Sequence, residues 1–174
     1  MLKIIGILIL SCMFSISCFA QHVSKEHESE EEDFEHHSNF EESSLTIGIG
    51  VPYSTAINQI GINLRMYFNI GEHICFGPEY SYFRNDEYEI VDFDLIGHYI
   101  FETPIVGIYP LFGVNYTVET DRVFDDEVEE EFGLIYGLGV HRNVAGVTFF
   151  AEYSRVEFGI DDQFVTGGVM YTFK

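Results

Sequence analysis

The segment Ile60–Ile70, IGINLRMYFNI, places an apolar residue at every second position. Side chains of a β-strand point alternately to the two faces of a sheet, so this periodicity predicts a strand with one apolar and one polar face. In a water-soluble barrel the apolar row points inward to the core, whereas in a membrane barrel it points outward to lipid. The rest of the sequence decides between these two arrangements.

Segments with the same alternation follow one another along most of the chain, and no helix-period segment appears after the first twenty residues. Each is about ten residues long, which is the length of a tilted membrane strand. Short turns and longer loops alternate between them, an asymmetry typical of outer-membrane barrels, whose short turns face the periplasm. The other predicted strands are Leu45–Tyr53, Ile74–Phe83, Tyr88–Phe101, Val106–Val118, Phe132–His141, Gly146–Arg155 and Phe164–Phe173.

The polar row mixes glycines with charged side chains, which suits the narrow interior of an eight-stranded barrel, where side chains fill the space. We therefore expect the apolar row of Ile60–Ile70 to face lipid. The predicted fold is all-β, an eight-stranded antiparallel up-and-down transmembrane β-barrel. Charged residues expected in the lumen are Arg65, Glu79, Asp92, Asp94 and Glu152.

The N-terminal part of the chain differs from the rest. Residues 1–20 carry Lys3, a short apolar run and a small residue, Ala20, before a polar one, which predicts a cleaved secretory signal peptide. Residues 21–43 are rich in Glu and His and have almost no hydrophobic pattern, so we expect a disordered arm. The barrel then occupies residues 44–174.

Composition limits the partners. Cleavage after residue 20 would leave Cys75 as the one cysteine, so no internal disulfide is expected. The net charge of −21, from 29 acidic and 8 basic residues, argues against a nucleic-acid partner. No cofactor is expected.

The C-terminal GGVMYTFK (residues 167–174), together with VDFDLIGHYIFETP (91–104) and GIYPLFGVNYTVE (107–119), resembles the small eight-stranded outer-membrane β-barrel proteins of Gram-negative bacteria, and most closely the outer membrane protein beta-barrel domain families. The resemblance covers residue 44 to the end. It implies export to the outer membrane and insertion by the barrel-assembly machinery, which commonly recognises a C-terminal aromatic residue. Here Phe173 is penultimate and Lys174 follows. The family implies no catalytic residues.

The lumen charges allow two interpretations. Counting back from the turn at Gly71, Arg65 lies opposite Glu79, and across the next hairpin Glu79 lies near Asp94. A lone charge in a narrow protein interior is costly, so these groups are expected to pair in a structural network that plugs the barrel. The alternative follows from the surplus of carboxylates over one guanidinium, which could line a narrow cation or proton path.

Two other acidic regions could bind cations. Imidazoles among the carboxylates of the arm are a speculative metal site, formed by His22, His27, His36 and His37. The outer loops are acidic as well, and could hold divalent cations that bridge to lipopolysaccharide phosphates or face a basic partner. The loop residues concerned are Asp121, Asp125, Asp126, Glu127, Glu129, Glu130, Glu131, Asp161 and Asp162.

No nucleophile stands in an obvious pattern with a general base, so no enzymatic activity is predicted. The expected role is a structural or surface-interaction protein of the outer membrane that acts through its acidic outer loops. Two alternatives remain open: the narrow conducting barrel, and a secreted soluble barrel that binds a hydrophobic ligand. The last requires the apolar row to point inward.

Overall fold

In the computed structural model the described residues, 44–71, 73–121, 127–159 and 161–173, form strands joined by short connections. None of the described segments forms a helix long and apolar enough to cross a membrane. The strands are β1 (Leu45–Ser54), β2 (Gln59–Asn69), β3 (Ile74–Arg84), β4 (Tyr88–Tyr99), β5 (Phe101–Glu102), β6 (Gly107–Asp121), β7 (Glu127–Val144), β8 (Val147–Glu157) and β9 (Asp162–Phe173).

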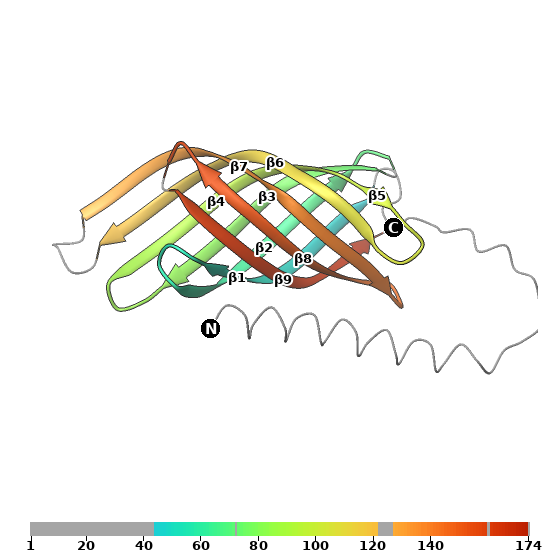
Figure 1. Ribbon diagram of the computed structural model, residues 1–174, viewed down its shortest axis with the longest axis horizontal. Helices are drawn as coiled ribbons and strands as arrows, with labels where there is room; N and C mark the ends of the chain where they lie inside the picture. The colour runs from blue at the N-terminus through green and yellow to red at the C-terminus, as the bar shows by residue number, and fades with distance from the viewer. Residues whose placement is uncertain (1–43, 72, 122–126, 160, 174) are drawn as a thin grey trace, which may run out of the picture. The chain divides into compact units, whose positions relative to one another are not determined.

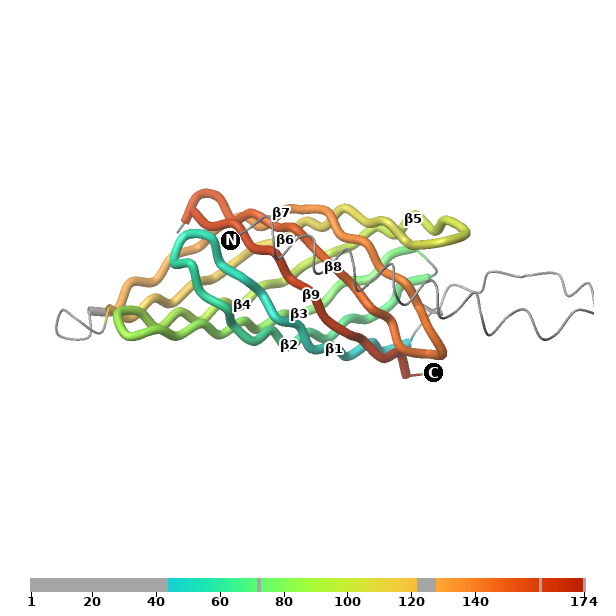
Figure 2. Tube along the Cα trace, turned by 60° about the horizontal axis from the view of Figure 1, so that its bottom comes forward, coloured from blue at the N-terminus to red at the C-terminus, as the bar shows by residue number. Residues whose placement is uncertain are grey.

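The sheet closes on itself, because the first strand, β1, pairs antiparallel with the last, β9, over its whole length. Figures 1 and 2 show these two strands side by side at the seam of the barrel. β4 and β5 are interrupted only at Ile100 and pair with β6 in one continuous register, from Tyr88↔Asp121 to Glu102↔Gly107. They therefore form a single wall strand, and the barrel has the eight antiparallel strands in up-and-down order that the sequence predicts.

Two connections differ from the predicted ones. The turn expected at Arg142–Val144 lies instead at Ala145–Gly146, where both residues have positive φ, 53° and 86°. Positive φ at both positions suits a two-residue hairpin turn. The Asn143 side chain accepts a hydrogen bond from the Gly146 amide at 3.0 Å. The loop expected over Glu119–Glu131 is largely strand, because β6 and β7 stay paired as far as Asp121↔Glu127.

The apolar rows lie on the outside of the barrel. Leu64, Phe93 and Val114 are 51%, 50% and 50% exposed, whereas Arg65 and Asp94, from the opposite rows, are 3% and 8% exposed. The rows of Leu64, Phe93 and Val114 thus face away from the lumen, as predicted for a lipid-facing wall. A soluble carrier needs the reverse arrangement, so the alternative of a secreted barrel that binds a hydrophobic ligand is wrong.

Aromatic side chains collect near both ends of this exterior. At the end with the tight turns, Tyr99 packs on Phe101 and Tyr171 on Phe173, with ring centroids 4.8 Å and 4.9 Å apart. At the other end Tyr116 packs on Phe132, at 4.8 Å. Two such girdles are typical of membrane-spanning barrels, whose aromatic rings lie at the interfaces.

Tyr136 is a further exterior aromatic residue, although it lies in the middle of the predicted strand Phe132–His141. In the structure it pairs with Arg155, close to the end of β8. Its hydroxyl donates a hydrogen bond to Glu157 Oε1 at 2.7 Å. The strand ends are staggered, so a mid-strand residue of β7 lies beside the outer rim of its neighbour.

One glycine allows two strands to approach unusually closely. A Cβ on Gly77 would lie 1.9 Å from the carbonyl oxygen of Met66 on β2. The next residue, Pro78, has no N–H to give to the ladder, and the β2–β3 pairing skips the positions between Arg65↔Glu79 and Phe68↔Phe76. Only glycine fits at this point of the lumen wall.

β6 and β7 stay paired to the outer end of the wall, where β4 also pairs with β6 as far as Tyr88↔Asp121 (Figure 1). On the other side of β7, pairing with β8 begins only at Leu134↔Glu157. Within the described part of the chain, residues 128–132 therefore have a strand partner on one side only. We call residues 117–121 and 127–131 the acidic ribbon.

The exterior assignment predicts a depth-dependent penalty for added charge. Leu64 lies midway along β2 and Ile60 at its outer end. Leu64→Arg should lower the free energy of unfolding in phospholipid vesicles by about 2–4 kcal/mol, and the matched Ile60→Arg by about 0–1 kcal/mol, because the cost of a cation falls from the membrane midplane to the interface. Reversible urea unfolding followed by fluorescence or gel mobility measures both. Equal and small effects would contradict a lipid-facing wall.

Candidate functional site

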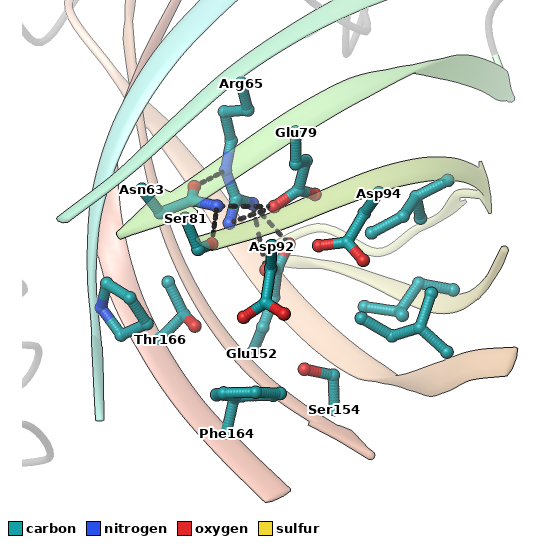
Figure 3. Close-up of a pocket in the computed structure, with 14 residues that line it drawn as sticks. Asn63, Arg65, Glu79, Ser81, Asp92, Asp94, Glu152, Ser154, Phe164 and Thr166 are labelled. Atoms are coloured by element: carbon teal, nitrogen blue, oxygen red, sulfur yellow. Dashed lines mark hydrogen bonds and ion pairs between the residues drawn. The ribbon is translucent and has the colours of Figure 1, made fainter. Parts of the chain in front are cut away.

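The centre of the lumen holds a buried ion triad. Arg65, on β2, contacts Glu79 Oε2 on β3 through Nη2 at 3.0 Å, and Glu152 on β8 through Nη1 at 2.7 Å and 2.8 Å. The guanidinium also lies over the ring of Phe150, 4.0 Å from its centroid. Figure 3 shows the two carboxylates reaching this guanidinium from different walls of the barrel. All three charged side chains are almost fully buried.

Neutral hydrogen-bond donors complete the triad. Tyr67 donates its hydroxyl to Glu79 Oε1, and Tyr109 donates its hydroxyl to Glu152 Oε1 at 2.7 Å. Asn63 accepts from Arg65 Nε at 2.8 Å and donates to Glu79 Oε2 at 2.8 Å. Two carboxylates against one guanidinium leave one surplus negative charge, and the hydroxyl and amide donors stabilise it inside the lumen. We call these six residues, with Arg65 at the centre, the Arg65 layer.

Two further carboxylates lie nearer the outer rim. Thr117 donates to Asp92 Oδ1 at 2.5 Å, and Asn115 donates to Asp94 Oδ1 at 2.7 Å. The structure describes no lysine or arginine in contact with either carboxylate. Both are nonetheless buried, so their charge is offset only by neutral donors or by a bound proton.

The Arg65 layer divides the lumen into two small spaces. A cavity of about 20 Å³ lies on its outer side, lined by Arg65, Asp92 and Asp94 among others. A second, of about 10 Å³, is lined by Tyr67 and Tyr109 on the opposite side of the layer. One water molecule needs about 10–15 Å³, so neither space could hold a hydrated ion. The hydrogen-bonded layer between them closes the barrel.

The second cavity lies beside a polar cluster that the sequence did not predict. Cys75 Sγ lies 3.3 Å from His98 Nδ1, and the ring of His98 packs against that of Tyr109, 5.0 Å away. On the far side of Tyr109, His141 stacks at 5.5 Å and contacts Glu102 Oε1 through Nε2 at 3.3 Å. The alternation of side chains along each strand places Cys75, His98 and His141 in the lumen. This alternation is the one feature of the sequence from which the cluster could have been predicted.

Two glycines make room for this cluster. A Cβ on Gly139 would lie 2.4 Å from the ring of Tyr109, and one on Gly107 would lie 2.3 Å from Nε2 of His141. The small residues of the polar rows thus accept large rings from neighbouring strands. This is the packing role that the sequence predicts for glycine in a narrow lumen.

The structure brings Arg65, Glu79 and Glu152 into direct contact, and leaves Asp92 and Asp94 as a separate group nearer the rim. In the described residues, no three His, Cys, Asp or Glu side chains gather closely enough to hold a metal ion. The signal peptide, the arm and the speculative metal site of His22, His27, His36 and His37 lie outside the described residues.

The outer acidic residues are not one uniform solvated face. Asp162, predicted in a loop, is the first residue of β9 and is buried. It accepts hydrogen bonds from the Ser54 hydroxyl and, at 2.9 Å, from the Ala56 amide, so it fastens the β1–β2 turn to β9. The prediction of a loop position is wrong for this residue, because Asp162 begins β9 and its strand position turns it inward.

The acidic ribbon carries like charges directly opposite one another where Glu119 faces Glu129. The pKa of Glu119 is raised from its usual value, first by partial burial and then by the carboxylates of Glu129, Asp121 and Glu131. Cross-strand like charges destabilise a hairpin, so pairing here persists against electrostatic repulsion.

No protein-family model and no curated protein matches the chain. Solved structures do. The N-terminal β-barrel domain of OprF from Pseudomonas aeruginosa matches with a TM-score of 0.67 at 14% identity, over 76% of this chain and 98% of that one. Neisserial surface protein A (NspA) gives 0.60 at 14%, over 75% and 96%. Ail, the attachment invasion locus protein of Yersinia pestis, gives 0.55 at 17%, over 75% and 97%.

At these identities the likeness shows the fold alone. The chain has the fold of the small eight-stranded outer-membrane β-barrels, which confirms the fold expected from the sequence. Its apolar exterior and aromatic girdles agree with the outer-membrane location predicted for it.

Removing the central cation should cost more than removing the whole triad. Arg65→Met leaves Glu79 and Glu152 buried without their partner, and should lower the free energy of unfolding by about 3–5 kcal/mol. The triple variant Arg65→Met, Glu79→Gln, Glu152→Gln removes the charges together and should recover most of this loss. Urea unfolding in vesicles compares the three proteins. A triple variant as unstable as the single one would show that packing, and not charge, holds the layer.

The ribbon should become more stable in acid. Since the folded ribbon raises the pKa of Glu119, it binds the proton more tightly than an open ribbon does. Its stability therefore rises as the pH falls through this raised pKa and is lower at neutral pH. Hydrogen exchange of amides 117–121 and 128–131, corrected for intrinsic rates, should slow at acidic pH. Glu119→Gln should give the slower exchange at neutral pH, whereas the control Asp161→Asn should not.

Proposed function

We propose that the protein is an outer-membrane β-barrel with a structural or surface-interaction role, and that it acts through its outer rim. The observation that supports this most directly is the closed lumen. The Arg65 layer fills the centre of the barrel, and the cavities of about 20 Å³ and 10 Å³ beside it are too small for a solute. A general porin needs an open channel, so we expect this protein to act through its outer surfaces.

The acidic ribbon is the part of the described rim best suited to contact another molecule. It lies at the outer end of β6 and β7 (Figure 1), where residues 128–132 have a described strand partner on one side only. Its exposed or half-exposed carboxylates are Glu119, Asp121, Glu129, Glu130 and Glu131. A concentrated negative charge attracts cationic partners and divalent ions. Of the structural neighbours, one is named a surface protein and another an attachment invasion locus protein. Those names suggest roles at the cell surface.

The other partners follow from the fold. Outer-membrane lipid would contact the apolar exterior, and the barrel-assembly machinery would insert the strands. Divalent cations would bind at the ribbon or the arm.

A second candidate function is supported by Asp92 and Asp94. These carboxylates have no cationic side chain in contact within the described residues, and they line the larger cavity. A cation or proton moving along the lumen would meet them first from the outer rim. It would then have to pass the Arg65 layer, so conduction requires that layer to rearrange.

A genetic experiment tests the surface role. In the native host, deletion of the gene should raise sensitivity to detergent, and the wild-type chain should restore resistance. A ribbon variant with Glu119, Asp121, Glu129, Glu130 and Glu131 changed to the corresponding amides should reach the outer membrane and yet fail to restore it. A control variant with the lumen pair Asp92→Asn and Asp94→Asn should restore it fully.

The control also separates the two candidates. Single-channel recording of the purified barrel in planar bilayers should show no steps for the wild-type protein. If the wild-type protein conducts, and the Asp92→Asn, Asp94→Asn variant loses both conductance and complementation, the conducting function is supported and the surface role is contradicted.

A further inference from the structure

The polar cluster on the tight-turn side of the Arg65 layer contains a thiol and an imidazole in direct contact. Cys75 and His98 are cross-strand partners on β3 and β4, so backbone pairing fixes their distance. Their side chains are 2% and 6% exposed, and Sγ lies 3.3 Å from Nδ1. The proposed surface role uses neither group.

The second nitrogen of His98 is the anomaly of this cluster. Nε2 is buried and has no hydrogen-bond partner among the described residues. Aromatic rings flank the imidazole, with Tyr67 edge-on at 4.7 Å and Tyr109 at 5.0 Å. A buried polar atom without a partner costs about 1–3 kcal/mol, so the described fold leaves this imidazole incompletely satisfied. Nδ1 is the nitrogen that faces Cys75 Sγ, so an ion bound by Sγ would be shared with Nδ1 and not with Nε2.

The space beside the imidazole is small and unusual in its donors. The cavity of about 10 Å³ is lined by the sulfur-containing side chains of Cys75 and Met170 and by the imidazoles of His98 and His141. Aromatic and aliphatic side chains form the rest of its wall, and no carboxylate lines it. This volume is at the lower limit of what one water molecule needs, whereas a bare metal ion needs less space.

The donor set selects among metals. Calcium and magnesium bind to oxygen ligands, which this cavity does not offer. Structural zinc is held by four ligands, and no three His, Cys, Asp or Glu side chains of the described chain gather closely enough for that. Thiolate, thioether and imidazole together favour Cu(I), which accepts two or three ligands. A monovalent ion bound to one thiolate is also neutral as a pair, so no net charge is buried in the lumen.

We propose that this cavity is a binding site for one Cu(I) ion, with Cys75 Sγ and His98 Nδ1, which face each other, as ligands and the Met170 thioether as the third donor. Binding replaces the thiol proton: the S–H bond breaks, an S–Cu bond forms, and the proton is released to solvent. No electron is transferred, because the copper arrives already reduced. His141 lies between the cavity and the half-buried carboxylate of Glu102 at the rim, and provides a route from the tight-turn side.

Copper titration of the folded full chain in detergent tests the site. Cu(I) is supplied with ascorbate under nitrogen, in competition with a chromophoric Cu(I) chelator. To remove binding by residues 1–43, every protein carries Cys12 and Cys18 changed to Ser, and His22, His27, His36 and His37 changed to Gln. This parent should bind one equivalent. Cys75→Ser and His98→Gln should each weaken binding at least tenfold, and Met170→Leu severalfold. The control His73→Gln, at an exposed rim imidazole, should leave binding unchanged.

Two readouts distinguish ligation from a loss of fold. X-ray absorption of the copper-loaded parent should show sulfur and nitrogen neighbours, and His98→Gln should lose the nitrogen contribution. Affinity should rise by up to tenfold per pH unit while the thiol is protonated. Heat-modified gel mobility reports whether each variant is folded. Should a variant fail to fold, the parent's spectrum decides: copper without a sulfur neighbour, or a parent that binds no copper, overturns the proposal.

Discussion

Complete backbone pairing in the wall is the constraint on which the rest of this structure depends. Hydrocarbon offers no hydrogen bonds, so a sheet can cross a membrane only when its first and last strands pair. The pairing of β1 with β9 meets that demand and fixes a cylinder of eight strands. Since the outer face must then be apolar, polar side chains are confined to a lumen too narrow for bulk water. Buried charge is therefore a consequence of closure.

The lumen manages that charge in two different ways. Around Arg65 a cation is shared by two carboxylates, and tyrosine hydroxyls stabilise the remaining charge. Around Asp92 and Asp94 only neutral donors are present. The first arrangement ties β2, β3 and β8 together across the interior. The second leaves two carboxylates whose protonation can change without breaking an ion pair.

Much of the fold could be predicted from the sequence because an apolar residue at every second position identifies a β-strand and separates its two faces. The row of Leu64 and the row of Arg65 differ in composition, and that difference assigned the faces. Arg65 opposite Glu79 followed from counting back through one short turn. Glu152 could be assigned to the lumen but not to Arg65, since the two are separated by 87 positions and meet only across a closed barrel. The Cys75–His98 pair and the inward Asp162 depend on strand ends and register, which the pattern does not fix. The paired ribbon was missed because its acidic composition resembles that of a loop.

Residues 128–132 of β7, which have a described strand partner on one side only, affect how neighbouring barrels can associate in the membrane. An uncovered strand edge is a template on which another copy of the same chain could assemble, and membrane proteins are held at high lateral density in a common plane. Docking of two such edges would align Glu129 and Glu131 of one barrel with the same carboxylates of the next, at a spacing where repulsion is strong. The negative charge along this edge should therefore oppose the docking of one barrel on another.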